Sequence, residues 1–276
     1  MTVGVVLALC SAFVWGAGDF CGGRAATKSH PFQVLVLAAV SGIAMLAVLA
    51  IIVSEPLVFD RSIVWAAAAG LAAGAGIVAL YGGLAIGSAA TVAPVAAVAA
   101  AVLPVLFGAM TDGWPRAAQL AGFVLALAGI WLVAGSTTAG PASHEGLKLG
   151  ALAGLGFGAF FILIAQVEVR AVYVPLAVAR AMMLLTAVST LALRRIPLPG
   201  LASNPIGLLA GVLDAGGTIL YLIARQHVRM DIAAVLSSLY PVSTVVLAHV
   251  VTGEQIAPTQ WVGVCVCLLA ITLIAA

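Results

Sequence analysis

The sequence predicts an all-α integral membrane protein in which ten transmembrane helices form two inverted five-helix repeats. The prediction rests on the composition, on a series of long apolar segments and on an internal repeat. Of the 276 residues, 64% are hydrophobic and 7% are charged, whereas a soluble domain carries about 25% charged residues. A soluble core cannot bury this much apolar surface, so we expect the chain to lie in a lipid bilayer. The net charge of +2 is too small to indicate binding to nucleic acid.

Ten apolar segments have close to the length of about 20 residues that a membrane-spanning helix needs. They are continuous and rich in Ala, Leu and Gly, without the alternation that is typical of β-barrel strands. Charged and turn-forming residues separate them, and Asn204 followed by Pro205 marks a helix start. The predicted spans are 2–22, 32–53, 63–83, 88–110, 117–135, 147–167, 172–193, 205–224, 231–251 and 258–276.

The two halves of the chain resemble each other at a nearly constant offset in numbering. The matching pairs include Leu80–Tyr81 with Leu220–Tyr221 and, after one residue of slippage, Gln119 with Gln260 and Gly122 with Gly263. We therefore divide the chain into repeats 1–140 and 141–276, each with five spans. Because five is odd, the two repeats have opposite orientations in the membrane. Inverted repeats are typical of secondary transporters, in which the binding site lies near the midplane between them.

The orientation of the whole protein is left open by its basic residues. Five Lys or Arg residues follow odd-numbered spans and five follow even-numbered spans. The positive-inside rule compares such loops, and here it favours neither side.

The segment 236–275 carries a recognisable pattern. A proline follows a run of small residues, a Gly-Glu pair comes at the membrane edge, and the last span holds a Gln and a Gly: Pro241, Gly253–Glu254, Gln260 and Gly263. In these features the segment resembles the C-terminal part of EamA-type carriers of the drug/metabolite transporter superfamily. Residues 80–135 resemble it more weakly, with Asp112 at the position where the family usually has Glu, and "WG" at 15–16 resembles the family's first helix.

The resemblance implies ten helices, a central cavity lined by both halves, and export or exchange of a small metabolite or drug-like solute. We therefore expect a multi-pass protein of the cell membrane, and specifically of a prokaryotic plasma membrane, rather than an enzyme. A receptor or scaffold would not require an inverted repeat. No ATPase motif is visible, so a gradient of substrate or protons would drive alternating access. We predict no cofactor and no metal site, and both a monomer and a homodimer stay open.

Two charged residues lie deep in consecutive spans. Asp214 is nine residues past Pro205, about 14 Å into its helix, and Arg180 is fourteen residues before Arg194, about 21 Å from that side. An ionised Asp or Arg at the bilayer centre costs about 2.5–3.5 kcal/mol. We therefore expect Arg180 and Asp214 to face the interior and to pair. The pair is either structural, or Arg180 meets an anionic substrate group while Asp214 acts as counter-charge or proton carrier.

Asp19 and Trp15 lie in the first span. Asp19 is about 26 Å from the start of its helix, close to the far interface, so the sequence favours a position at the membrane surface near Arg24. The alternative is an acid at the mouth of a substrate cavity. Trp15 lies in the middle of the membrane, away from the interfaces where Trp concentrates, and either lines a cavity or packs in the core.

Prolines and small polar residues mark further candidate positions. Prolines within the predicted spans are Pro94, Pro104 and Pro241. Each removes a backbone hydrogen bond, which a membrane tolerates only where the helix faces protein or a cavity. Beside Pro241, the hydroxyl groups of Ser237, Ser238 and Tyr240 either bind substrate or form hydrogen bonds between helices, and the second role is the commoner.

A glycine occurs at every fourth position near the start of the sixth span. The residues are Gly146, Gly150, Gly154 and Gly158. This spacing places them on one face of a helix, and small residues on one face allow a neighbouring helix to approach closely. The sequence predicts a structural role for this ridge.

An alternative function comes from "GAGD" at 16–19. It matches a Gly-x-Gly-Asp pattern of aspartyl proteases that cut within membranes. These proteases resemble one another in having a second membrane aspartate at the same depth, usually earlier in the chain. Here no acidic residue precedes Asp19, and Asp214 is much deeper. Two carboxylates must come within hydrogen-bond reach to share a proton, so the sequence favours the carrier.

Overall fold

The computed structural model describes residues 2–56, 60–85, 89–134, 144–168, 172–253 and 255–275. Within these residues the chain is helical, as predicted, and ten helical spans are long and apolar enough to cross a membrane. The helices are α1 (Thr2–Ala26), α2 (Pro31–Ile52), α3 (Arg61–Ala85), α4 (Ala89–Thr111), α5 (Ala117–Ala134), α6 (His144–Ile164), α7 (Tyr173–Leu193), α8 (Pro205–Arg225), α9 (Met230–Ser237), α10 (Tyr240–Thr252) and α11 (Pro258–Ala275). The predicted boundaries at 88, 135 and 276 and the motif residue Glu254 lie outside the described residues.

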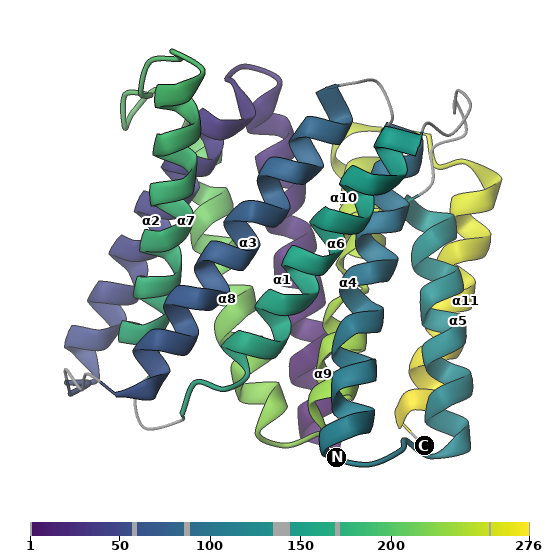
Figure 1. Cartoon of the computed structure of the whole chain (residues 1–276). Helices are drawn as coiled ribbons and strands as arrows, with labels where there is room; N and C mark the ends of the chain where they lie inside the picture. Colours follow the sequence, from purple (N-terminus) through teal and green to yellow (C-terminus); the bar gives the residue numbers. More distant parts are fainter. Residues whose placement is uncertain are drawn as a thin grey trace.

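The helices run side by side between the upper and the lower end of the molecule (Figure 1). Both chain ends lie at the lower end. We call this end, where α1 begins, the terminal end. The opposite end, where α1 finishes and α2 begins, is called the distal end.

Helix starts follow the local sequence. Asn204 accepts a hydrogen bond from the Gly207 backbone N–H at 3.3 Å, which confirms the predicted start of α8. At α2, the backbone N–H of His30 donates to the Gln33 side chain at 3.1 Å, and Pro31 is the first helical residue. These side chains replace the hydrogen bonds that the first turn of a helix lacks.

Close helix contacts recur at equivalent positions of the two halves. At Gly70 of α3, an added Cβ would overlap the backbone of Ala179 of α7, and at Gly211 of α8 it would overlap the backbone of Ala38 of α2. The offset in numbering from Gly70 to Gly211 is the same as that from Ala38 to Ala179. The contacts between α3 and α7 and between α8 and α2 are therefore equivalent.

The contact between α5 and α11 shows the relative direction of the repeats. Gly122 of α5 faces Ile274 near the end of α11, whereas Gly129, further along α5, faces Gly263 near the start of α11. The two equivalent helices therefore run antiparallel, as the inverted repeat predicts. Their first turns are capped alike, because Gln119 accepts from the Arg116 N–H at 3.1 Å and Gln260 from the Ala257 N–H at 3.0 Å.

Helices of one half pack mainly on helices of the other. Helix α8 packs on α1 and α2, and α3 packs on α6 and α7. Helix α4 packs on α6. An added Cβ would collide with α4 at the ridge glycines Gly154 and Gly158 and would make an unusually tight contact with it at Gly150. The predicted structural role of these three glycines is confirmed.

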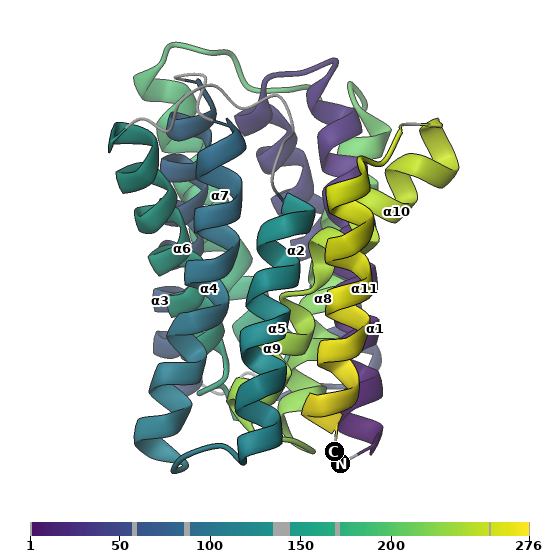
Figure 2. The ribbon, with the colours of Figure 1, turned by 90° about the vertical axis from the view of Figure 1, so that its right-hand side faces the viewer.

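The predicted ninth span, 231–251, is not continuous. Helix α9 ends at Ser237 and α10 begins at Tyr240, with Pro241 in its first turn. Proline has no N–H, so Pro241 cannot bond to the carbonyl of Ser237 four residues earlier. Figure 2 shows α10 leaning away from the other helices. Pro94 and Pro104, by contrast, lie inside the unbroken α4.

The equivalent glycine contacts give a stability prediction. Gly70→Ala and Gly211→Ala should each lower the free energy of unfolding by about 1–3 kcal/mol, because the methyl group must push a backbone aside. Thermal unfolding of the detergent-purified protein would measure this. Gly23→Ala is the matched control, since an added Cβ there meets no described atom within 4 Å. Equal midpoints for all three variants would contradict the close backbone contacts.

Candidate cavity between the repeats

A cavity of about 400 Å³ lies between the two halves of the chain. Eight helices line it: α1, α2, α3 and α4 from the first half and α6, α7, α8 and α10 from the second. Small-molecule sites are typically about 300–1,000 Å³ and mainly apolar, with a few polar groups that orient the ligand. The size and position of this cavity fit such a site.

The cavity reaches toward the distal end. Its wall includes Gly22 and Gly23 near the end of α1, Val34 near the start of α2, and Tyr81 in the last turns of α3. All three of these helix ends belong to the distal end. The cavity therefore extends toward the distal end of the molecule.

Three aromatic rings form a floor on the terminal side of the cavity. Trp15 lies 5.5 Å from Phe161 and 6.0 Å from Tyr221, measured between ring centroids, and Phe161 lies 5.1 Å from Tyr221. All three residues are buried. The Tyr221 hydroxyl donates to the Phe161 carbonyl oxygen at 3.0 Å. Because these rings come from α1, α6 and α8, the floor joins both halves of the chain.

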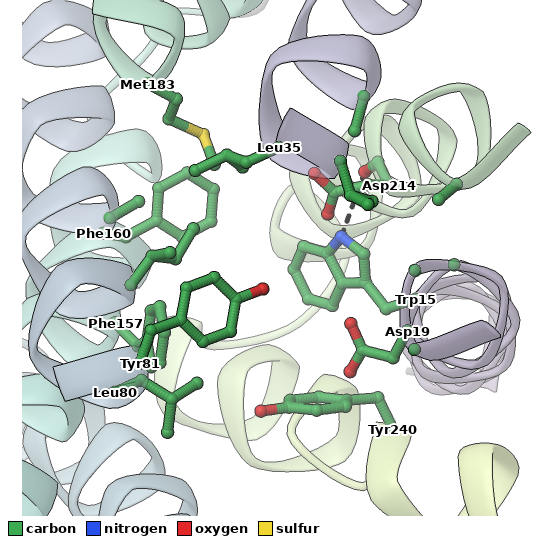
Figure 3. A pocket seen from close by; sticks show the side chains of 18 of the residues that line it. Trp15, Asp19, Leu35, Leu80, Tyr81, Phe157, Phe160, Met183, Asp214 and Tyr240 are labelled. Carbon is green, nitrogen blue, oxygen red and sulfur yellow. Dashed lines mark hydrogen bonds between the residues drawn. The ribbon is translucent and has the colours of Figure 1, made fainter. Parts of the chain in front are cut away.

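Trp15 has both roles that the sequence left open. Its ring lines the cavity and also packs in the core. The indole Nε1–H donates to the backbone carbonyl oxygen of Asp214 at 3.0 Å, the contact drawn as a dashed line in Figure 3. This hydrogen bond holds the Trp15 ring in the floor of the cavity.

The predicted ion pair between Arg180 and Asp214 is present. The Arg180 guanidinium also donates to the Thr218 hydroxyl at 2.8 Å, and its side chain is only 7% exposed. The Asp214 side chain is 39% exposed and lines the cavity. The buried cation is therefore neutralised within the protein, and the carboxylate is the member of the pair that a solute can reach.

Asp19 lies in the wall of the cavity, the alternative that the sequence left open, and not at the end of its helix. Helix α1 continues to Ala26 instead of ending at residue 22, so Asp19 is seven residues, about 10 Å, inside the helix end. Its carboxylate points into the cavity between the rings of Trp15 and Tyr240 (Figure 3). Among the described residues it makes no ion pair.

The hydroxyl groups near Pro241 have different positions. Tyr240 lines the cavity, at the start of α10. Ser237 and Ser238 do not line it: both are buried, and Ser237 donates to the Ala8 carbonyl oxygen of α1 at 3.3 Å. Neither serine therefore lines this cavity, and for Ser237 the hydrogen bond between helices, the commoner of the two roles left open by the sequence, is observed.

Several cavity residues were missed by the sequence analysis. They are mainly aromatic: Tyr81, Phe157, Phe160 and Phe161, with Met183 beside them. The available signal was the segment "GFGAFF" at 156–161. It places three phenylalanines close together in the helix that carries the glycine ridge.

Two stretches of the chain, 2–135 and 144–276, match the model of the EamA-like transporter family. The chain belongs to this family. Each match covers five of the ten predicted spans, and the resemblance seen in residues 236–275 is confirmed. The EamA-like transporter is thus a multi-pass membrane protein built from two copies of one five-helix unit.

Comparison with solved structures supports the fold of the EamA-like transporter. A crystal structure of another protein superposes with a TM-score of 0.73, covering 99% of this chain and 96% of that chain, at 17% sequence identity. At this identity the likeness shows the fold alone. A search of curated proteins finds no match.

The geometry also bears on the protease alternative for "GAGD" at 16–19. In this EamA-like transporter Asp19 and Asp214 line the same cavity, but Asp214 is bound by Arg180. An aspartyl dyad requires two carboxylates that share one proton. The Asp214 carboxylate is engaged by the Arg180 guanidinium, so among the described residues it does not form such a dyad with Asp19.

The ion pair gives a second prediction. Asp214→Leu should destabilise the EamA-like transporter by about 3 kcal/mol, because it leaves the buried Arg180 without a counter-charge. Arg180→Met should cost less, since the remaining carboxylate is accessible from the cavity. The double variant should be more stable than Asp214→Leu. Denaturant unfolding of all four proteins measures the coupling, and additive effects of the two single changes would contradict the pair.

Proposed function

We propose that the chain is a secondary carrier that moves a small metabolite or drug-like solute across a cell membrane by alternating access. The observation that carries this proposal is the cavity, which both halves of the chain line and which reaches one end of the molecule but ends at an aromatic floor toward the other. A carrier needs such a site, because it must expose its solute to only one side at a time.

A group of polar contacts made by Arg229, which we call the polar latch, supports a closed terminal end. Arg229, between α8 and α9, donates to the backbone carbonyl oxygens of Asp112 at 3.0 Å and Gly113 at 2.6 Å, and pairs with Asp231 at 2.9 Å. Asp112 and Gly113 lie in the turn between α4 and α5. The latch therefore ties the two halves together on the side of the floor.

The proposal also includes the membrane in which the carrier acts and the gradient that drives it. The protein would act in a prokaryotic plasma membrane, with the lipid bilayer and a small-molecule substrate as its partners and without cofactor or enzymatic activity. A gradient of substrate or protons would drive it. The carrier would act as a monomer or as a homodimer.

A ligand screen followed by transport tests the proposal. Thermal unfolding of the purified protein is measured with amino acids, nucleosides, sugars and cationic drugs, and a ligand at 100 times its dissociation constant should add about 2.7 kcal/mol to stability. The stabilising compound is then tested for counterflow in proteoliposomes. Binding with counterflow supports the carrier, and binding without counterflow contradicts it.

A cavity-filling variant gives the third prediction. Leu35 lines the cavity on α2, so Leu35→Trp should lower both ligand-induced stabilisation and counterflow at least tenfold by occupying the solute's space. Val48→Trp is the matched control, because Val48 is an exposed residue of the same helix. Equal loss of counterflow in both variants, or in neither, would contradict the assignment of the cavity as the solute path.

A further inference from the structure

We propose that the cavity takes an organic monocation, an ammonium group on an aromatic or aliphatic frame, with Asp19 as its counter-ion. This inference rests on the proposed carrier function and names the substrate class of the same site.

The first step is the charge of the wall. Among the described residues that line the cavity, the charged side chains are Asp19, Asp214 and Arg180. Arg180 and Asp214 pair with each other. The wall therefore carries one negative charge in excess when both carboxylates are ionised, and that excess belongs to Asp19.

The second step excludes an anionic partner. The Arg180 Nη1 group is directed to Asp214 and to the Met183 sulfur at 3.6 Å, and Nη2 donates to Thr218 at 2.8 Å. The Arg180 side chain is almost completely buried. A substrate carboxylate or phosphate would have to displace Asp214 from the guanidinium, and it would then face two carboxylates. The anionic substrate group considered for Arg180 on sequence grounds is thus disfavoured.

The third step is the ring content of the wall. Aromatic rings around the cavity belong to Trp15, Tyr81, Phe157, Phe160, Phe161 and Tyr240. The face of an aromatic ring is electronegative and attracts cations, and cages of such rings are a recurrent means of binding quaternary ammonium groups. Trp15 and Tyr240 flank the Asp19 carboxylate, and the Tyr81 hydroxyl points toward it from the opposite wall (Figure 3).

The fourth step is the environment of Asp19. A carboxylate within a membrane-spanning helix is costly and needs a compensating partner. The labelled side chains that face Asp19 across the cavity, Tyr81, Phe157 and Leu80, are uncharged (Figure 3), and none of the described Lys, Arg or His residues forms an ion pair with Asp19. A bound ammonium group would supply the compensating charge, and a neutral or anionic solute would not. The site should therefore select for a cation.

Calorimetric titration of the purified full chain tests the inference with four probes of one frame. These are benzyltrimethylammonium, the neutral N,N-dimethyl-2-phenylacetamide, the anion phenylacetate and the zwitterion phenylalanine. We expect the wild type to bind the cation at least tenfold more tightly than the other three. Asp19→Asn should weaken binding of the cation at least tenfold, and Asp19→Glu should restore most of it.

Asp112→Asn is the matched control, because Asp112 is an exposed acid in the turn between α4 and α5, and it should bind the cation as the wild type does. The inference is overturned if the neutral, anionic or zwitterionic probe binds wild type as tightly as the cation, or if none binds. Equal cation affinity in wild type and in folded Asp19→Asn also overturns it. Failure of the carrier function looks different: the cation binds through Asp19 but shows no counterflow in proteoliposomes.

Discussion

Arg180 and Asp214 can each lie within a hydrocarbon layer only because the other neutralises its charge. This constraint links the helices at the centre of the molecule. The pair joins α7 to α8. Thr218 extends it by accepting from Arg180 and donating to the Asp214 carbonyl oxygen at 2.9 Å. The same carbonyl accepts from the Trp15 indole, so the network continues into α1. A buried charge pair is costly to desolvate, and its retention at the cavity wall is better explained by what it does to the cavity than by stability.

The repeat supplies a nearly symmetric scaffold, and the polar groups break that symmetry. The offset that relates Gly70 to Gly211 also relates Ala39 to Arg180, Ala73 to Asp214 and Asp19 to Phe160. Each of the three charged residues therefore has an apolar equivalent in the other half. The glycine contacts, which set how closely helices approach, are by contrast present in both halves. The shared positions determine packing, and the differences between the halves determine the chemistry of the cavity.

The sequence predicted the position of a residue correctly where that position depended only on the distance to a nearby helix end. The depths of Arg180 and Asp214 follow from nearby helix ends, and pairing is the physical response to that depth. The distance of Asp19 from its helix end was underestimated, because α1 extends four residues beyond its predicted end. The orientation of Ser237, Tyr240 and the phenylalanines of α6 could not be predicted, because lipid and protein interior are both apolar. A helix between them lacks the polar face that reveals orientation in a soluble protein.

The contacts between helices also bear on which helices could move together in the proposed transport cycle. Helix α8 of the second half packs on α1 and α2, and α3 of the first half packs on α6 and α7. Helix α2 also packs on α7, so these contacts interlock the two sequence repeats instead of leaving each as a separate rigid body. The Arg180–Asp214 pair adds a link between α7 and α8.

The aromatic floor joins α6 to the closely packed helices α1 and α8, since Phe161 lies on α6 while Trp15 and Tyr221 lie on α1 and α8. In the proposed carrier, opening the terminal end would require Phe161 to move away from the other two rings. The Tyr221 hydrogen bond to the Phe161 carbonyl oxygen would then have to break as well, so the floor holds the terminal end closed through both ring contacts and a hydrogen bond.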